Sequence, residues 1–229
     1  MSFCIGGLQK SSLIDFPNKI ACIVFTKGCN FRCGYCHNPE LLENKAPTLE
    51  VSALYDFLKT RMGKLDGVVI TGGEPTLQKG LKEVIKQIKS MGFLVKLDTN
   101  GTNPKILEEL LNENLLDYVA MDIKAPFNKY QSIVNTDIDI SKIQKSIDLI
   151  MKSSVEHEFR TTVIKSQLLE QDLESIAKSI KGAKRYYLQE FIPSKILDKN
   201  LMCEKSYTHD EFEKICVMLN KYVEFCGYR

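Results

Sequence analysis

The stretch IACIVFTKGCNFRCGYCHNPE, residues 20–40, joins a short apolar run to a loop that carries three cysteines. Residues 20–25 are almost wholly apolar and include β-branched side chains, which predicts a buried strand. Comparable runs recur along the chain, and segments with apolar residues at helical spacing lie between them. The predicted strands cover residues 20–25, 67–71, 93–97, 118–121, 158–163 and 186–191.

The alternation of strands and helices is typical of a parallel sheet that is covered by helices. About six strand–helix units fit into the 229 residues, whereas a closed eight-unit barrel typically needs about 250. We therefore predict an α/β fold, a partial (β/α)6 barrel of the TIM type, with a doubly wound open sheet as the alternative. Because no Pro-, Gly- or Ser-rich linker divides the chain, we expect a single domain over residues 1–229.

The composition is that of an ordinary globular protein, with 44% hydrophobic and 26% charged residues. The net charge of +2 is too close to neutral to indicate nucleic acid or a membrane surface as a partner. Residues 1–10 are too short and too polar for a signal peptide. The sequence has no run of about 18 apolar residues, so it predicts no membrane-spanning helix. We expect a cytoplasmic enzyme.

Chemically active side chains follow or end each predicted strand. The cysteine loop comes after the first strand, and the motifs GGEP and DTNG come after the next two. Ligands of α/β sheets and barrels bind at the carboxyl ends of the strands, so we expect these segments to share one face. The segments are residues 27–36, 72–75 and 98–101, then Asp122 with Lys124, Arg160 and Glu190.

The cysteines of the loop, Cys29, Cys33 and Cys36, have the spacing C-x3-C-x2-C. A structural zinc site needs four ligands, and the nearby fourth ligand, His37, directly follows Cys36, so the backbone would have to fold sharply. Electron-transfer 4Fe–4S clusters generally use four cysteines. Three thiolates leave one iron of a 4Fe–4S cluster without a protein ligand. The spacing therefore predicts a cluster whose fourth iron binds a small molecule.

Four ordered motifs resemble the radical S-adenosylmethionine superfamily, and within it the activating proteins of glycyl-radical enzymes. The first of these motifs is the long block at residues 11–40, which looks most like the activators of anaerobic ribonucleoside-triphosphate reductase. The others are GGEP at 72–75, DTNG at 98–101 and MDIKAP at 121–126.

The resemblance implies chemistry that the cofactors carry, with no catalytic side chain beyond them. One electron from the cluster cleaves the sulfonium C–S bond of S-adenosylmethionine into methionine and a 5′-deoxyadenosyl radical. The radical then abstracts a hydrogen atom. The resemblance also implies a barrel of the radical S-adenosylmethionine type.

Several residues inherit cofactor contacts from the resemblance. Gly72, Gly73 and Glu74 would meet the methionine amino group, since two glycines permit close backbone approach, although an ordinary strand-to-helix turn is the alternative. Arg160 would bind the methionine carboxylate, with a surface salt bridge as the alternative. Tyr35 lies between two of the cysteines and would offer an apolar wall to the adenine, with simple packing as the alternative. The remaining predicted contacts are His37 and Asn38 to the ribose, and Asp98 and Lys124 to the cofactor.

The acids Asp98 and Asp122 are expected to converge on one face, where they repel each other unless a cation lies between them. Resemblance to the activator of pyruvate formate-lyase implies a monovalent cation there, with carbonyl ligands from Thr99 and Ala120. The alternative is that Asp98 caps a turn.

The resulting hypothesis is an enzyme that docks on a glycyl-radical enzyme, anaerobic ribonucleoside-triphosphate reductase, and abstracts hydrogen from one glycine. Flavodoxin or ferredoxin would supply the electron. The alternatives are an activator of another glycyl-radical enzyme or a small-molecule enzyme similar to 7-carboxy-7-deazaguanine synthase. A third hypothesis is a non-enzymatic protein that senses redox state through its cluster, but the presence of GGEP together with DTNG disfavours it. Cysteines outside the loop are expected to be packing or surface thiols: Cys4, Cys22, Cys203, Cys216 and Cys226.

Overall fold

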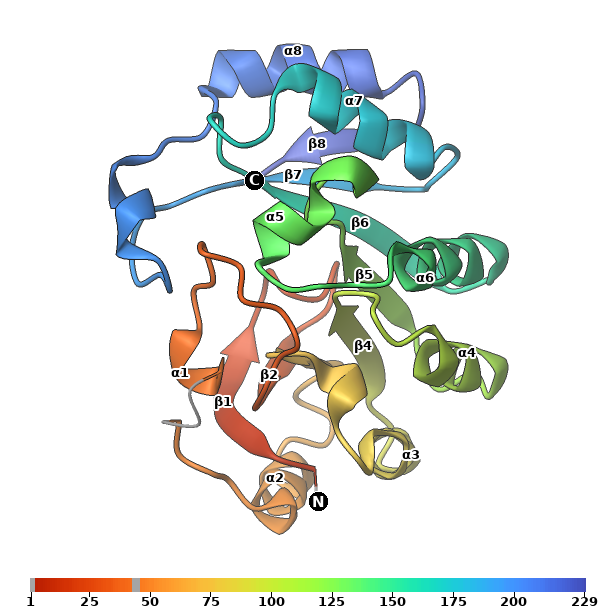
Figure 1. Ribbon diagram of the computed structural model, residues 1–229. Helices are drawn as coiled ribbons and strands as arrows, with labels where there is room; N and C mark the ends of the chain where they lie inside the picture. The colour runs from red at the N-terminus through yellow and green to blue at the C-terminus, as the bar shows by residue number, and fades with distance from the viewer. Residues whose placement is uncertain (1–2, 43–45) are drawn as a thin grey trace. The chain divides into compact units, whose positions relative to one another are not determined.

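The computed structural model describes residues 3–42 and 46–229, in which strands alternate with helices (Figure 1). The strands are β1 (Ile5–Ser12), β2 (Ala21–Thr26), β3 (Gly67–Gly72), β4 (Leu94–Thr99), β5 (Tyr118–Asp122), β6 (Glu156–Val163), β7 (Tyr186–Glu190) and β8 (Cys226–Tyr228). The α-helices are α1 (Pro39–Leu42), α2 (Val51–Lys59), α3 (Leu81–Ser90), α4 (Pro104–Asn112), α5 (Tyr130–Val134), α6 (Ile140–Lys152), α7 (Glu170–Ser179) and α8 (His209–Leu219). Three short 3-10 turns are η1 (Pro75–Leu77), η2 (Phe127–Lys129) and η3 (Lys199–Cys203).

The strands are ordered β1 to β8 in the sheet, which is also their order along the chain. β1 pairs with β2 in antiparallel fashion, whereas β2 with β3, β3 with β4, β6 with β7 and β7 with β8 are parallel. Helices form the crossovers between parallel strands, as the geometry of such pairs requires. The predicted parallel α/β arrangement is confirmed.

All six predicted strands are present as β2 to β7, and no end differs from the prediction by more than two residues. The two outer strands were missed. β1 has the sequence IGGLQKSS, whose glycines and polar residues lack the apolar run of a buried strand. β8 has only three residues, too few to show a pattern.

The described residues divide into two compact units. The first comprises the described parts of Met1–Asn30 and Glu40–Thr99, together with Asn103–Val119. The second comprises Phe31–Pro39, Asn100–Thr102 and Ala120–Arg229. The expectation of a single domain over residues 1–229 stays a prediction.

The first unit contains β2, β3 and β4, whose side chains are mostly buried. In β2 every residue except Phe25 is buried, which explains why this run is apolar on both faces. Phe16, Ala21, Ile23, Val69 and Tyr118 form a core cluster. The helix α3 buries side chains at helical spacing, namely Leu81, Val84, Ile85 and Ile88.

The second unit buries the apolar faces of its long helices in the same way. α6 contributes three isoleucines, and α8 contributes Phe212, Ile215 and Leu219. A capping box starts α8, because the Thr208 amide donates to Glu211 Oε2 at 2.9 Å and the Glu211 amide donates to Thr208 Oγ1 at 3.3 Å. Among the residues that the structure describes, no helix is both long enough and apolar enough to cross a membrane.

Candidate functional site

The cysteine loop leaves the end of β2 and runs to α1. Cys29 belongs to the first unit, and Cys33 and Cys36 belong to the second. The Cys36 amide donates to the Cys33 carbonyl at 3.0 Å, which forms a tight turn between these two cysteines. None of the three cysteines is in a disulfide. All three thiols are therefore chemically available as ligands.

Cys33 is buried, whereas Cys29 and Cys36 are half-buried. Burial raises the pKa of the Cys33 thiol, and the nearby Lys124 ammonium opposes that shift. At neutral pH the unligated thiol therefore keeps its proton. Cysteines bind metals as thiolates, so Cys33 would have to release this proton in order to hold a cluster.

Tyr35 lies between the last two cysteines and is buried. Its hydroxyl has no hydrogen-bond partner among the residues that the structure describes. The Lys124 ammonium lies 5.9 Å from the centre of its ring. A buried hydroxyl without a partner is costly in a folded protein, so this position fits contact with a bound group.

Hydrogen bonds from distant segments of the second unit hold the loop around Tyr35. The Arg32 amide donates to the Val134 carbonyl at 2.8 Å, and the Asp198 amide donates to the Gly34 carbonyl at 2.8 Å. An added Cβ at Gly34 would lie 2.9 Å from the Leu201 side chain, so the glycine lets the loop pack closely against η3. The conformation of the loop is thus set by tertiary contacts as well as by its own turn.

The GGEP motif lies at the end of β3 in the first unit. Packing against neighbouring backbone explains why both of its first two residues are glycines, which the sequence did not reveal. Gly72 has a φ of 117°, and an added Cβ would overlap the backbone of Thr26. An added Cβ at Gly73 would overlap the carbonyl of Gly28, directly before the first cysteine. The two glycines therefore let the motif pack against the base of the cysteine loop, in addition to any ligand they approach.

Glu74 is fully buried and links this motif to the end of β4. Its Oε1 accepts hydrogen bonds from the Thr76 amide at 3.0 Å, the Thr76 hydroxyl at 2.5 Å and the Thr99 hydroxyl at 2.7 Å. The carboxylate therefore begins η1 and holds Thr99 in place. These contacts make Glu74 a positioning residue, whereas its predicted contact with the cofactor stays a prediction.

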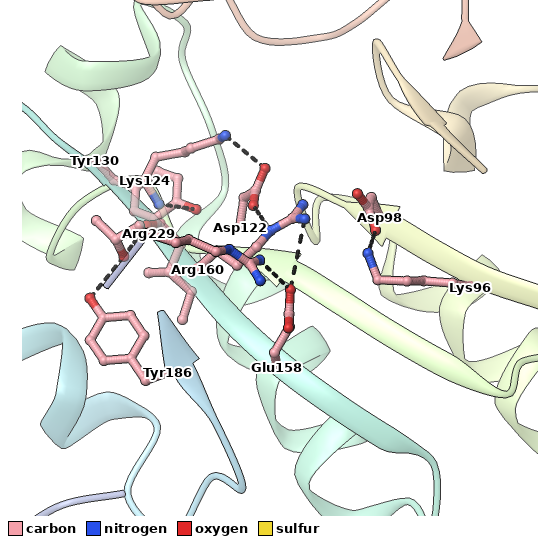
Figure 2. Close-up of polar contacts among 11 residues, drawn as sticks. Lys96, Asp98, Asp122, Lys124, Tyr130, Glu158, Arg160, Tyr186 and Arg229 are labelled. Atoms are coloured by element: carbon pink, nitrogen blue, oxygen red, sulfur yellow. Dashed lines mark hydrogen bonds and ion pairs between the residues drawn. The ribbon is translucent and has the colours of Figure 1, made fainter. Parts of the chain in front are cut away.

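Asp98 is paired with a residue that the sequence analysis did not single out. Lys96 lies in β4 with a side chain only 2% exposed, and its ammonium donates to Asp98 Oδ1 at 2.5 Å (Figure 2). The same ammonium lies 5.8 Å from the centre of the Tyr118 ring. A signal was present in the sequence, because residues two apart on a strand share one face and LVKLDT places a lysine two residues before the acid.

Asp122 ends β5 and accepts two charged hydrogen bonds in the second unit. Lys124 Nζ lies 3.0 Å from Asp122 Oδ2, and Arg160 Nε lies 2.7 Å from Asp122 Oδ1 (Figure 2). Burial by itself raises the pKa of this carboxyl, but the charges of Arg160 and Lys124 together outweigh burial and hold the pKa well below its ordinary value. Asp122 is therefore ionised at neutral pH.

The network continues from Arg160 to residues that the sequence analysis missed. Arg160 Nη1 lies 3.9 Å from Glu158 Oε1, and Arg229 Nη2 lies 2.6 Å from the same oxygen. In these contacts, the cations Lys124, Arg160 and Arg229 alternate with the anions Asp122 and Glu158, so each of the two acids has at least one cationic partner.

The predicted residues thus fall into two groups. Cys29, Gly72, Gly73, Glu74, Asp98 and Thr99 belong to the first unit, and Cys33, Tyr35, Cys36, His37, Asn38, Ala120, Asp122, Lys124 and Arg160 belong to the second. His37 is exposed, with its ring centre 6.3 Å from that of Phe191. Among the described residues, no three His, Cys, Asp or Glu side chains gather closely enough to hold a single metal ion. A 4Fe–4S cluster binds each cysteine to a different iron, which is a more open arrangement.

A protein-family model of the radical SAM superfamily matches residues 23–180. The chain therefore belongs to the radical SAM superfamily, whose members use a 4Fe–4S cluster and S-adenosylmethionine. The predicted fold, a partial barrel of this type, is confirmed.

A relative that is similar over nearly the whole chain shows which group within the superfamily this protein belongs to. The chain is 37% identical to a protein of Methanocaldococcus jannaschii named "Putative glycyl-radical enzyme activating enzyme", over 98% of this chain and 95% of that protein. The chain belongs to this group of activating enzymes.

Solved structures support the fold. A domain of pyruvate-formate lyase-activating enzyme from Bacteroides vulgatus matches 71% of this chain and 98% of its own length, with a TM-score of 0.58 and 16% identity. The structure of Streptococcus suis SuiB bound to S-adenosylmethionine matches 88% of this chain and 48% of its own, with a TM-score of 0.65 and 13% identity.

The residues of the chain fit the cofactors of the superfamily. Three thiols outside any disulfide supply the soft ligands that an iron–sulfur cluster prefers. Arg160 and Lys124 bring positive charge, as an anionic ligand requires. The unsatisfied hydroxyl of Tyr35 lies in the same unit as these two cations.

Proposed function

We propose that this protein installs a glycyl radical on a partner enzyme and that the partner is anaerobic ribonucleoside-triphosphate reductase. The observation that carries the proposal is the 37% identity, over nearly the whole chain, with the M. jannaschii relative named for glycyl-radical activation. The block at residues 11–40 supports the choice of the reductase as the partner. Flavodoxin or ferredoxin is the proposed electron donor, and the cytoplasm, where thiols stay reduced, is the proposed location.

Cys29, Cys33 and Cys36 are the proposed ligands of the cluster. Together the cluster and S-adenosylmethionine supply a one-electron cleavage of a carbon–sulfur bond and a carbon radical able to abstract hydrogen. The chain itself binds and orients these groups. Buried Tyr35 is proposed to exclude water beside Cys33 and Cys36, since it lies between them in the chain and its ring centre is 5.9 Å from the Lys124 ammonium.

Arg160 is the proposed partner of the methionine carboxylate. Asp122 holds its Nε, and Glu158 lies beside its Nη1, so the plane of the guanidinium is fixed before a ligand arrives. A guanidinium that is held in this way loses little side-chain entropy when it binds a carboxylate. His37 and Asn38 are proposed to contact the ribose, and the GGEP backbone the amino group.

The test is an anaerobic reconstitution with iron and sulfide, followed by addition of reductant, S-adenosylmethionine and the purified reductase. We expect a glycyl-radical doublet in the electron paramagnetic resonance spectrum and one 5′-deoxyadenosine per radical formed. A reductase with its radical glycine replaced by alanine serves as the control, and it should give no doublet.

Two outcomes separate the candidate functions. Formation of 5′-deoxyadenosine without a doublet would contradict activation of the reductase and would favour a small-molecule substrate or another glycyl-radical enzyme. Absence of both products from a fully loaded enzyme would contradict the proposed chemistry as a whole.

A further inference from the structure

The resemblance to the activator of pyruvate formate-lyase implies a monovalent cation bound by Asp98 and Asp122. The structure instead gives each of these carboxylates a cationic partner from its own unit. Asp98 accepts a hydrogen bond from Lys96 at 2.5 Å, and Asp122 accepts hydrogen bonds from Lys124 at 3.0 Å and Arg160 at 2.7 Å. Figure 2 shows the ammonium and guanidinium groups directed at the carboxylates.

The predicted contact of Asp98 with the cofactor does not explain why the side chain of Lys96 is buried beside it. The Lys96 side chain is 2% exposed and the Asp98 side chain 12% exposed. An ammonium removed from water to this extent is stable only if a negative charge and good hydrogen-bond geometry accompany it. Lys96 thus needs Asp98, and its charge neutralises the carboxylate that was expected to bind a metal ion.

Asp122 is neutralised more than once. Lys124 and Arg160 contact different oxygens of the carboxylate, and both cations are at least four-fifths buried. A metal ion that binds Asp98 or Asp122 would lie close to a positively charged ammonium or guanidinium group that already contacts the same carboxylate. Like charges a few ångströms apart in a buried setting repel strongly, so the donor set does not fit an added cation.

We propose that this enzyme needs no monovalent metal ion and that the ammonium of Lys96 takes the place of that ion beside Asp98. Lys96 is then a positioning residue, which fixes the last residues of β4 and the carboxylate of Asp98 among them. The inference rests on the proposed cofactor site, but it is independent of the identity of the partner enzyme. It also predicts a specific gain of cation dependence when the lysine is removed.

The first experiment compares the reconstituted holoenzyme in choline, lithium, sodium and potassium chloride at equal ionic strength, without a partner enzyme. The dissociation constant for S-adenosylmethionine is measured by anaerobic equilibrium dialysis, and the thermal midpoint is measured in the same buffers. For the unmodified protein we expect the dissociation constant to vary by less than about twofold, below the range of a true coupled site. A saturable improvement of about fivefold or more with sodium or potassium would overturn the proposal.

The second experiment uses Lys96→Ala, which leaves the buried Asp98 carboxylate without its ammonium and vacates space beside it. We expect this variant to bind S-adenosylmethionine at least about fivefold more weakly in choline chloride and to recover with sodium or potassium. Its thermal midpoint should rise by about 3 °C or more on the same change, a shift typical of one restored contact in a chain of this size. Lithium, sodium and potassium should differ, because they differ in size.

Matched controls separate this effect from general destabilisation. Lys89→Ala removes a more exposed lysine that is paired with Asp117 at 2.7 Å in the same unit, and it should gain no cation response. The double variant Lys96→Met with Asp98→Asn removes both charges, so it should fold and stay indifferent to the salt. If Lys96→Ala does not fold in any salt, the response of the unmodified protein and the double variant decides the question.

Each further outcome bears on the proposal. A Lys96→Ala variant that folds but shows no cation response would contradict a metal-like role for Lys96. A double variant that acquires cation dependence would contradict it as well. If the unmodified protein forms no glycyl radical on the reductase, the proposed function is contradicted. The salt dependence of the thermal midpoint and of S-adenosylmethionine binding would still test the role of Lys96.

Discussion

Arg229 Nη2 lies 2.6 Å from Glu158 Oε1, and the side chain of Glu158 is only 2% exposed. The two residues are 71 positions apart in the chain. The Arg229 amide also donates to the Leu188 carbonyl at 3.0 Å, so the backbone beyond β8 stays beside β7. The contact therefore neutralises a buried carboxylate that lies next to Arg160, the proposed partner of the cofactor carboxylate.

Replacement of Arg229 tests this contact. We expect Arg229→Ala to lower the free energy of unfolding by about 2 kcal/mol, less than the roughly 3–5 kcal/mol of a fully buried pair, because Arg229 is 41% exposed. Urea denaturation measures the change. Arg185→Ala, which breaks an exposed contact with Glu156, is the control and should cost about 1 kcal/mol or less. Equal losses in the two variants would contradict the assignment.

Replacement of Cys33 tests the cluster ligands. We expect Cys33→Ala to lose the charge-transfer absorbance of the cluster and most of its iron after anaerobic reconstitution, because two remaining thiolates hold a 4Fe–4S cluster poorly. Cys203→Ala removes an exposed thiol in η3 and should keep full iron content. Iron and sulfide analysis gives the readout. Full iron content in Cys33→Ala would show that this residue is not a ligand.

The close packing of GGEP against the cysteine loop gives another prediction. Gly73→Ala should disrupt the loop and reduce cluster loading severely, because its Cβ would overlap the backbone of Gly28. Gly7→Ala in β1 is the matched control, since its Cβ would make an ordinary contact of 3.6 Å with Phe25. Thermal midpoint and iron content are measured for both. A Gly73→Ala variant with normal values of both would contradict this account.

The pH dependence of stability should carry a contribution from His157. This residue is buried in β6, and its Nε2 has no hydrogen-bond partner among the residues that the structure describes. Burial lowers the pKa of His157 below its ordinary value of 6.5, because the charged imidazolium is poorly solvated there. Below pH 6.5 the unfolded state therefore binds a proton more readily than the folded state does.

Stability should accordingly fall as the pH drops below 6.5, by up to about 1.4 kcal/mol per pH unit from this residue, until the folded pKa is reached. Above pH 6.5 the residue contributes no pH dependence. The free energy of unfolding is measured by denaturation at several pH values between about 5 and 8, on both sides of the ordinary histidine pKa. This free energy should change less steeply with pH in His157→Phe than in the unmodified protein. His209→Phe, at an exposed site, is the control. An unchanged slope in His157→Phe would refute the prediction.

Much of the fold followed from local patterns. The runs that became β2, β3 and β5 are largely apolar because parallel strands covered on both faces bury nearly every side chain, and such runs are visible in a sequence. β1 could not be recognised in this way, because its pairing with β2 places polar residues at an edge. Its position depends on a partner strand rather than on its own composition.

The chemistry proposed for this protein was indicated by short motifs in the sequence, because the proposed ligands Cys33 and Cys36 are neighbours along the chain and their spacing survives folding. The charges around those ligands were decided by the tertiary structure. Lys96 is an unremarkable lysine until its strand is buried, and Glu158 meets Arg229 only through the order of β6, β7 and β8. A charge pair stabilises a buried site only when both partners leave water together, and that condition depends on packing between segments distant in the sequence.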